Sequence, residues 1–334
     1  MEGGVIREKL HDGWAQTVDG VSFGFINLLQ ARARGGSHGV EAFENYFKRW
    51  EDMPVGEFYR VPESTDFKLP EREGSFILPS PVQGDCPENN HTHLDIWLGP
   101  KGWESPMMFL LHGVMSVSDI GYRIWARTLN RLGWSAIFFH LPYHYGRRPK
   151  NAMSGEMALT SNVIRTADAI RQAVIELRLI CRLLRERGCP HVGLWGTSYG
   201  GWIAAMLSVL EPNISTAWLL EPIVDVDLAL WESPATWTLR RQLLRRGISR
   251  ELIRRELSRF CPSYHTPLVS PDHIILVAGT FDRIATPESI RNLHEKWPGS
   301  HYAEFRQGHV GYQLMPETLK LVRAKLPHLF PCDG

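Results

Sequence analysis

Three residues far apart in the sequence have the types needed to activate a hydroxyl group for attack. Ser198 lies in the pentapeptide Gly196-Thr197-Ser198-Tyr199-Gly200, Asp282 follows an apolar run at 274–279, and His309 stands in a later glycine-flanked loop. A serine hydroxyl is a weak nucleophile until a base takes its proton, and that base must be oriented by an acid. The three residues therefore predict a nucleophile, a general base and an orienting acid.

The residues around Ser198 predict the turn that such a nucleophile needs. The apolar run 191–195 before it is typical of a buried strand, and the run 201–210 after it is typical of a buried helix. A serine on a sharp turn between strand and helix is strained, and its neighbours must be small. Gly196 and Gly200 meet that need. A structural serine in a tight turn is the alternative, and the ordered acid and histidine downstream disfavour it.

Two other aspartates compete with Asp282 for the role of the acid. Asp225 and Asp227 follow the preceding predicted strand, at 216–220. We prefer Asp282 because it ends a strand and gives the order serine, aspartate, histidine along the chain. Asp225 and Asp227 remain alternatives at this point.

A developing alkoxide needs two backbone N–H donors, each of which typically contributes a 10²–10³-fold effect. The first donor is expected from Tyr199, directly after the nucleophile. The second is expected from the loop that follows His112 and Gly113, with Val114 preferred and Met115 as the alternative.

Several residues near the predicted strand ends are candidates for substrate contact. We predict four of them: His140, His144, Arg147 and Trp231. The alternatives are that the two histidines are only polar residues lining or bordering the pocket, that Arg147 lies on a solvated loop surface, and that Trp231 packs in the core. Together with His91 and His93, the histidines give no recognisable set of convergent metal ligands, so we expect no metal.

The elements that must position these residues alternate from about Pro106 onward. Alternation of strand and helix predicts an α/β fold with a mostly parallel sheet and helices on both faces. The expected strands are 107–111, 134–139, 191–195, 216–220, 273–278 and 302–305, and the expected helices are 119–132, 163–184, 201–210, 288–296 and 316–325.

Two regions stand outside this alternation. Residues 1–105 hold a predicted helix at 40–50 and extended segments at 75–78 and 93–98, which are candidates for antiparallel leading strands packed on the 106–334 core. Residues 228–270 are arginine-rich and predict a helical lid inserted in that core, with Ser249 as an N-cap and Gly247 as a stop between two helices.

The composition is ordinary for a globular enzyme-sized chain. The 334 residues carry a formal net charge of +1 and are 43% hydrophobic, so no global field favours nucleic acid. We expect no secretory signal and no transmembrane segment. The five scattered cysteines favour reduced thiols and a cytoplasmic location. The arginines of the lid leave peripheral membrane contact open.

From about Pro106 to the C-terminus the chain resembles the α/β-hydrolase superfamily in its G-x-S-x-G turn and in the order of its candidate triad. Over a shorter stretch, Leu141-Pro142-Tyr143-His144-Tyr145-Gly146-Arg147-Arg148-Pro149-Lys150 resembles the N-P-Y-Y-G-x-R-K-P run of the α/β-hydrolase-domain-containing protein 18 group. Leucine replaces the asparagine of that run, and a histidine replaces one tyrosine. The superfamily resemblance implies hydrolysis through an acyl-serine without a cofactor.

The leading hypothesis is a serine esterase, of carboxylesterase or lipase type, that acts on a small acyl ester. Amide, peptide or thioester hydrolysis by the same triad is the first alternative. The second is a hydrolase fold that serves only for binding, which the complete set of serine, aspartate and histidine disfavours.

Overall fold

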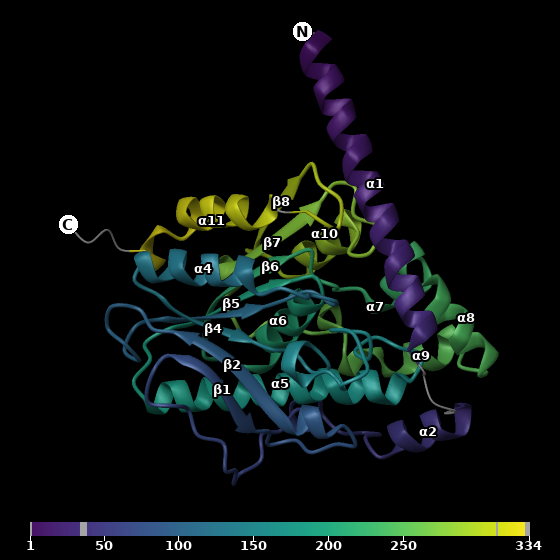
Figure 1. Cartoon of the computed structure of the whole chain (residues 1–334), viewed down its shortest axis with the longest axis horizontal. Coiled ribbons are helices and arrows are strands. Elements are labelled where there is room, and N and C mark those ends of the chain that lie inside the picture. The colour runs from purple at the N-terminus through teal and green to yellow at the C-terminus, as the bar shows by residue number, and fades with distance from the viewer. Residues whose placement is uncertain (1, 34–38, 312, 331–334) are drawn as a thin grey trace.

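A computed structural model describes residues 2–33, 39–311 and 313–330 of the chain. Its centre is an eight-stranded sheet in the order β1-β2-β4-β3-β5-β6-β7-β8 (Figure 1). The strands β3 to β8 run parallel to one another, whereas β2 pairs antiparallel with both β1 and β4 at one edge. The sheet therefore confirms the predicted α/β class and the antiparallel start.

Every predicted core strand is present, with ends within two residues of those expected. The bounds are β1 Gly74–Pro79, β2 His91–Trp97, β3 Met107–Leu111, β4 Ser135–Phe139, β5 Val192–Thr197, β6 Ile214–Leu220, β7 Ile274–Gly279 and β8 His301–Phe305. The strands β3, β4 and β7 are buried along their whole length, which explains why their sequences are continuous apolar runs.

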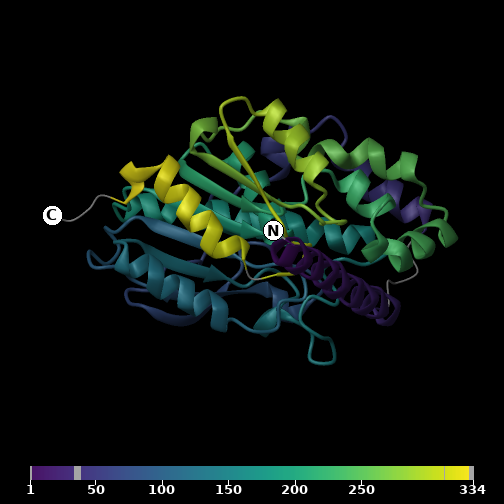
Figure 2. The same ribbon diagram turned by 90° about the horizontal axis from the view of Figure 1, so that it is seen from above.

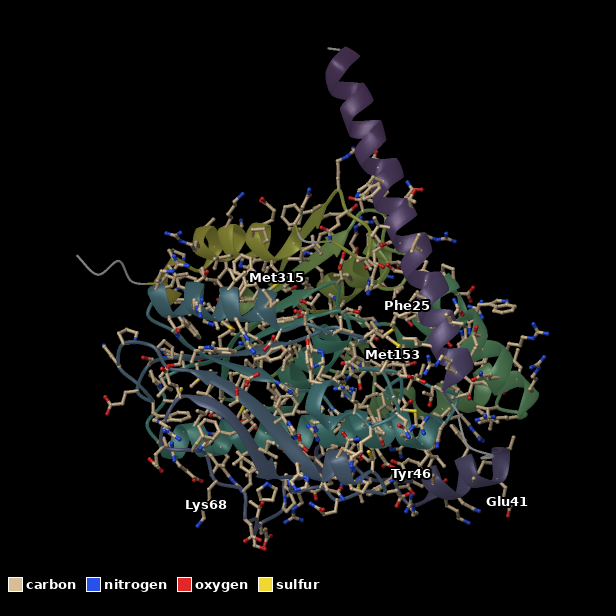
Figure 3. All side chains as sticks on the ribbon, viewed as in Figure 1. Phe25, Glu41, Tyr46, Lys68, Met153 and Met315 are labelled. Atoms are coloured by element: carbon tan, nitrogen blue, oxygen red, sulfur yellow. The ribbon has the colours of Figure 1, made fainter. Side chains whose placement is uncertain are left out.

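Helices cover both faces of the sheet (Figure 2). One face packs on α4 (Ile120–Arg131) and α11 (Leu314–Lys325). The other packs on α5 (Val163–Glu186), α6 (Tyr199–Leu210) and α10 (Pro287–Lys296). The short α2 (Val40–Lys48) lies against α5 and carries Tyr46, which Figure 3 labels. The Tyr46 hydroxyl donates to Asp168 Oδ1 at 2.6 Å. A further short helix, α3, spans Val55–Phe58.

The connection between β6 and β7 is helical, as the sequence predicts. It contains α7 (Val226–Trp231), α8 (Trp237–Arg245) and α9 (Arg250–Glu256), which we call the insertion. Ser249 caps α9 by accepting from the N–H of Leu252 at 3.3 Å, and Gly247 adopts a positive φ of 76° after α8. Both expectations for this turn are confirmed.

The first helix was not predicted. α1 spans Glu2–Arg32; in Figure 1 its C-terminal part lies over the insertion and its N-terminal part projects beyond the rest of the fold. Asn27 joins it to the insertion: its Nδ2 donates to Pro234 O at 2.8 Å, and its Oδ1 accepts from the N–H of Thr238 at 2.7 Å. No helix in the described part of the chain, α1 included, has the length and apolar character to cross a bilayer.

Four of the five cysteines are in described segments, and each is a free thiol. Cys181, Cys189 and Cys261 are buried, and Cys86 is partly exposed. The fifth, Cys332, lies outside the described residues. The expectation of reduced thiols is therefore met for these four cysteines.

Candidate active site

Ser198 sits at the turn from β5 to α6 in a strained backbone conformation, with φ 54° and ψ −114°. Glycine is required on both sides of it because backbone atoms of neighbouring segments approach these positions closely. A Cβ on Gly196 would lie 2.5 Å from the carbonyl oxygen of Gly200, and a Cβ on Gly200 would overlap the carbonyl oxygen of Leu111. The turn can therefore form only with glycine at both positions, which accounts for the pentapeptide.

The three predicted catalytic residues are in contact. The Nε2 atom of His309 lies 2.8 Å from Ser198 Oγ, and its Nδ1 atom lies 2.7 Å from Asp282 Oδ2. The other carboxylate oxygen, Asp282 Oδ1, accepts from the N–H groups of Ile284 at 2.7 Å and Ala285 at 3.0 Å. The backbone thus fixes the carboxylate, and the carboxylate fixes the imidazole.

The environment adjusts the basicity of His309. Burial acts to lower its pKa, but the charge and hydrogen bond of Asp282, aided by the charge of Asp19, raise that pKa above its ordinary value. An imidazole that is readily protonated next to a serine hydroxyl suits a general base.

The two competing aspartates have other partners. Asp225 Oδ1 caps α7 by accepting from the N–H of Leu228 at 3.0 Å. Asp227 is paired with Arg250 and Arg254, each at 2.7 Å from Oδ2. Because both carboxylates are held within the insertion, Asp282 alone of the three aspartates contacts His309.

A fourth polar residue, which the sequence did not indicate, holds the histidine loop from outside. Asp19 on α1 is buried, and its carboxylate accepts from the N–H groups of His309 at 2.7 Å and Val310 at 2.9 Å. A Cβ on Gly308 would overlap this carboxylate. α1 therefore contributes directly to the position of the loop, and finding Asp19 would have required predicting α1.

Glu221 provides another carboxyl group near the triad, in addition to those of Asp282 and Asp19. Glu221 follows β6 with a positive φ of 47° and is buried. Burial, followed by the charges of Asp282 and Asp19, raises the pKa of Glu221 well above its usual value, which favours the neutral acid. Its carboxyl oxygen, Asp282 and His309 place ligand-type atoms within 4.8 Å of one another, a spacing that a metal ion could bridge. Both ring nitrogens of His309 are already engaged by Ser198 and Asp282, so these residues fit a triad better than a metal centre.

The predicted oxyanion donors stand beside Ser198. Gly113 approaches it so closely that an added Cβ would lie 3.6 Å from Ser198 Cβ, and Val114 and Met115 line the same cavity as the serine. Tyr199 is the first residue of α6, where backbone N–H groups have no partner within the helix. Among the described residues, none accepts a hydrogen bond from the N–H of Val114, Met115 or Tyr199.

Ser198 and His309 open onto a cavity of about 480 Å³. Its wall combines the loop after β3, one side of α5, all three helices of the insertion, and side chains of α1 and α2. Residues from the first fifty positions that reach it are Ile26, Gln30, Phe43 and Phe47. No motif or periodic pattern in the sequence indicates that these residues line the site.

Arg147 is not a substrate-binding residue, so that prediction is wrong. Its guanidinium is fully buried and binds Glu176 on α5 through two contacts, at 2.7 and 2.8 Å. It also donates to the carbonyl oxygens of His140 and Asn89. An arginine that is fully buried in such a pair lies out of reach of a ligand in the cavity, and it serves to fix the loop after β4 to α5.

The other three substrate candidates also lie outside the cavity lining. His140 Nε2 lies 2.9 Å from Asp95 Oδ2. His144 is buried behind Tyr199, with 5.9 Å between the ring centroids, and burial lowers its pKa to about 4. Trp231 is half-buried and packs against the core. Packing thus explains residues that sequence position alone assigned to substrate.

Comparison with known proteins places this geometry in context. No protein-family model matches the chain. The uncharacterized protein Rv2627c of Mycobacterium tuberculosis is 26% identical over 315 residues, covering 86% of this chain and 73% of its own length.

Solved structures resemble the chain in fold. Acetyl xylan esterase 1 from Thermoanaerobacterium sp. is similar with a TM-score of 0.56 and 13% identity, over 88% of this chain and 96% of its own. The acylaminoacyl peptidase of Pyrococcus horikoshii is similar with a TM-score of 0.54 and 10% identity, over 77% of this chain and 40% of its own. With the eight-stranded, mostly parallel sheet, these likenesses show that the chain has the α/β-hydrolase fold.

Proposed function

We propose that the protein is a serine hydrolase that cleaves carboxylic esters through an acyl-serine intermediate. The observation that carries this proposal is the continuous contact from Ser198 Oγ through His309 to Asp282, at 2.8 and 2.7 Å. The resemblance in fold to proteins named as esterases agrees with it.

In the proposed mechanism Ser198 Oγ attacks the ester carbonyl carbon as His309 Nε2 takes the hydroxyl proton. The tetrahedral oxyanion accepts hydrogen bonds from the N–H groups of Val114 and Tyr199. Collapse breaks the bond to the alkoxy oxygen, which leaves with the proton from His309. Water then attacks the acyl-serine while His309 takes a proton from that water. The bond from the acyl carbon to Ser198 Oγ breaks, His309 returns the proton to Ser198 Oγ, and the carboxylic acid departs.

Asp282 stabilises the imidazolium that forms on His309 and fixes its tautomer, with the proton on Nδ1. Burial favours the neutral form of Glu221, which adds no further negative charge beside Asp282. Asp19 acts at a distance from the reacting atoms, as an acceptor for the backbone of the histidine loop.

Amide or peptide hydrolysis is the second candidate, because one of the similar structures is named as a peptidase. The same triad performs both reactions. The mostly apolar wall of the cavity beside Ser198 favours an acyl ester, since burying the polar groups of a peptide against apolar side chains is costly.

The test is a panel of aryl esters and aminoacyl amides assayed with wild type and with Ser198→Ala. We expect turnover of esters above amides, and we expect Ser198→Ala to lower kcat by several orders of magnitude, against about 10⁶ in a serine protease. Ser116→Ala is the matched control because Ser116 also lines the cavity but hydrogen-bonds Tyr145, not His309. Equal activity in Ser198→Ala and Ser116→Ala would refute the proposal.

A further inference from the structure

The wall of the cavity beside Ser198 is mostly apolar. Much of this wall consists of aliphatic and aromatic side chains from several elements, among them Phe43, Phe47, Ile170, Leu239, Leu243 and Phe260. Most of these side chains also belong to the main hydrophobic core, so the cavity is a hollow within that core. A hollow lined in this way favours an apolar occupant.

Charged groups are scarce on this wall. Among the described residues that line the cavity, none is lysine or arginine. The acidic side chain on the lining, Glu256, is bound to Arg259. Away from His309, a phosphate or carboxylate would find no lysine or arginine partner on this wall, and burying it unpaired would be unfavourable. The occupant therefore has to be uncharged along its length.

The size of the cavity exceeds what a short acyl group needs. At about 480 Å³ it falls within the range of roughly 300–1,000 Å³ that is usual for whole small-molecule sites. An acetyl group would leave most of this volume unfilled and would forgo most of the available contacts.

The chemistry of the acyl-serine decides which part of the ester occupies the cavity. The alcohol leaves in the first step and has to reach solvent, whereas the acyl group stays bound to Ser198 until water arrives. A pocket enclosed by the insertion, α1 and α2 suits the part that remains. A polar or bulky alcohol can instead face the opening.

We propose that the enzyme is selective for esters of long, uncharged acyl chains, and that α1 and α2 form part of the wall that holds the chain. This inference rests on the proposed function, because it names the substrate class of the same site. Ile26 is the test position on α1: it reaches the cavity, whereas Leu28 on the same helix is 57% exposed. Leu28 lies one turn from Phe25, which Figure 3 labels.

The experiment is a series of p-nitrophenyl acetate, butyrate, octanoate and dodecanoate, each used below its micelle-forming concentration. Burying one methylene favours binding by up to about fourfold. We expect kcat/KM to rise at least tenfold from acetate to octanoate and to hold or rise further at dodecanoate. A flat series, or one that peaks at acetate, would overturn the inference.

Two variants link this selectivity to the wall. Ile26→Trp should reduce the dodecanoate-to-acetate ratio of kcat/KM at least tenfold, whereas Leu28→Trp should leave the ratio unchanged. Ala167→Leu fills the cavity from α5 and provides a second test if Ile26→Trp disturbs the helix. If both cavity variants fold and the ratio is unchanged in each, the acyl chain does not occupy this cavity and the inference is wrong.

The outcomes separate the two proposals. Hydrolysis of acetate that depends on Ser198, without a gain from longer chains, would refute the acyl-chain inference and leave the serine hydrolase intact. Absence of turnover for every ester, together with no reaction of Ser198 with a fluorophosphonate, would refute the proposed function itself. Reaction of Ser198 without turnover of any ester in the series would refute the acyl-chain inference.

Discussion

Removal of the Asp19 carboxylate should loosen the loop that carries the catalytic base. Asp19 accepts two backbone hydrogen bonds, from His309 at 2.7 Å and from Val310 at 2.9 Å, although it lies about 290 positions away in the sequence. Hydrogen bonds to a charged group contribute about 1.5–3 kcal/mol each. Asp19→Asn keeps one acceptor oxygen and loses the other, so one such bond is removed.

Loss of one bond of that strength corresponds to a decrease in kcat of about tenfold to a hundredfold, if the loosened loop misaligns His309. Asp19→Ala removes both acceptors and should cost more. Asp19 also raises the pKa of His309 through its charge, so Asp19→Asn should shift the acidic limb of the pH profile to lower pH. A purely structural role would not move that limb.

Steady-state kinetics on a short aryl ester across pH, with thermal unfolding as a check on folding, measures both effects. Asp12→Asn is the matched control, because Asp12 lies on the same helix and pairs with the exposed Arg306. If Asp19→Asn has the kcat and pH profile of Asp12→Asn, the reasoning about α1 is wrong.

Three further predictions concern the buried charges. Since the pKa of His309 is raised, kcat/KM should be lost as pH falls through a value above 6.5, and Asp282→Asn should move that limb to lower pH in a pH–rate profile. Glu221→Gln replaces a neutral acid by a neutral amide and should leave the same profile in place, whereas a shifted limb would mean that Glu221 is ionised. Arg147→Met should lower the free energy of unfolding by about 3–5 kcal/mol in urea titrations, because it leaves a buried carboxylate unpaired. Arg60→Met, in an exposed pair, should change that free energy by at most about 1 kcal/mol, and equal losses would contradict the buried-pair account.

The sequence predicted those parts of the molecule in which the contacts of the folded state also determine the local residue pattern. Buried parallel strands such as β3 and β7 are continuous apolar runs because both of their faces are covered. The glycines around Ser198 are explained by the contacts that any side chain there would make. Ser198, Asp282 and His309 follow strands β5, β7 and β8, so their order along the chain is the order of those strands.

Other features could not be predicted because tertiary contacts override local signals. α1 contains glycines at positions 13, 20 and 24, which lower helix propensity, and it is held by contacts with the insertion. Arg147 lies in a sequence segment typical of a solvated loop, yet Glu176 on α5 draws it into the core. The wall formed by Ile26, Phe43 and Phe47 depends on where α1 and α2 pack, which no local periodicity reports.

Covalent trapping of the nucleophile tests the central claim most directly. Wild-type protein treated with an alkyl fluorophosphonate should gain a single adduct by intact-mass measurement, and peptide mapping should place it on Ser198. Ser198→Ala should gain none, while Ser116→Ala should react as wild type does. An adduct on another residue, or a Ser198→Ala variant that is labelled as strongly as wild type, would contradict the account.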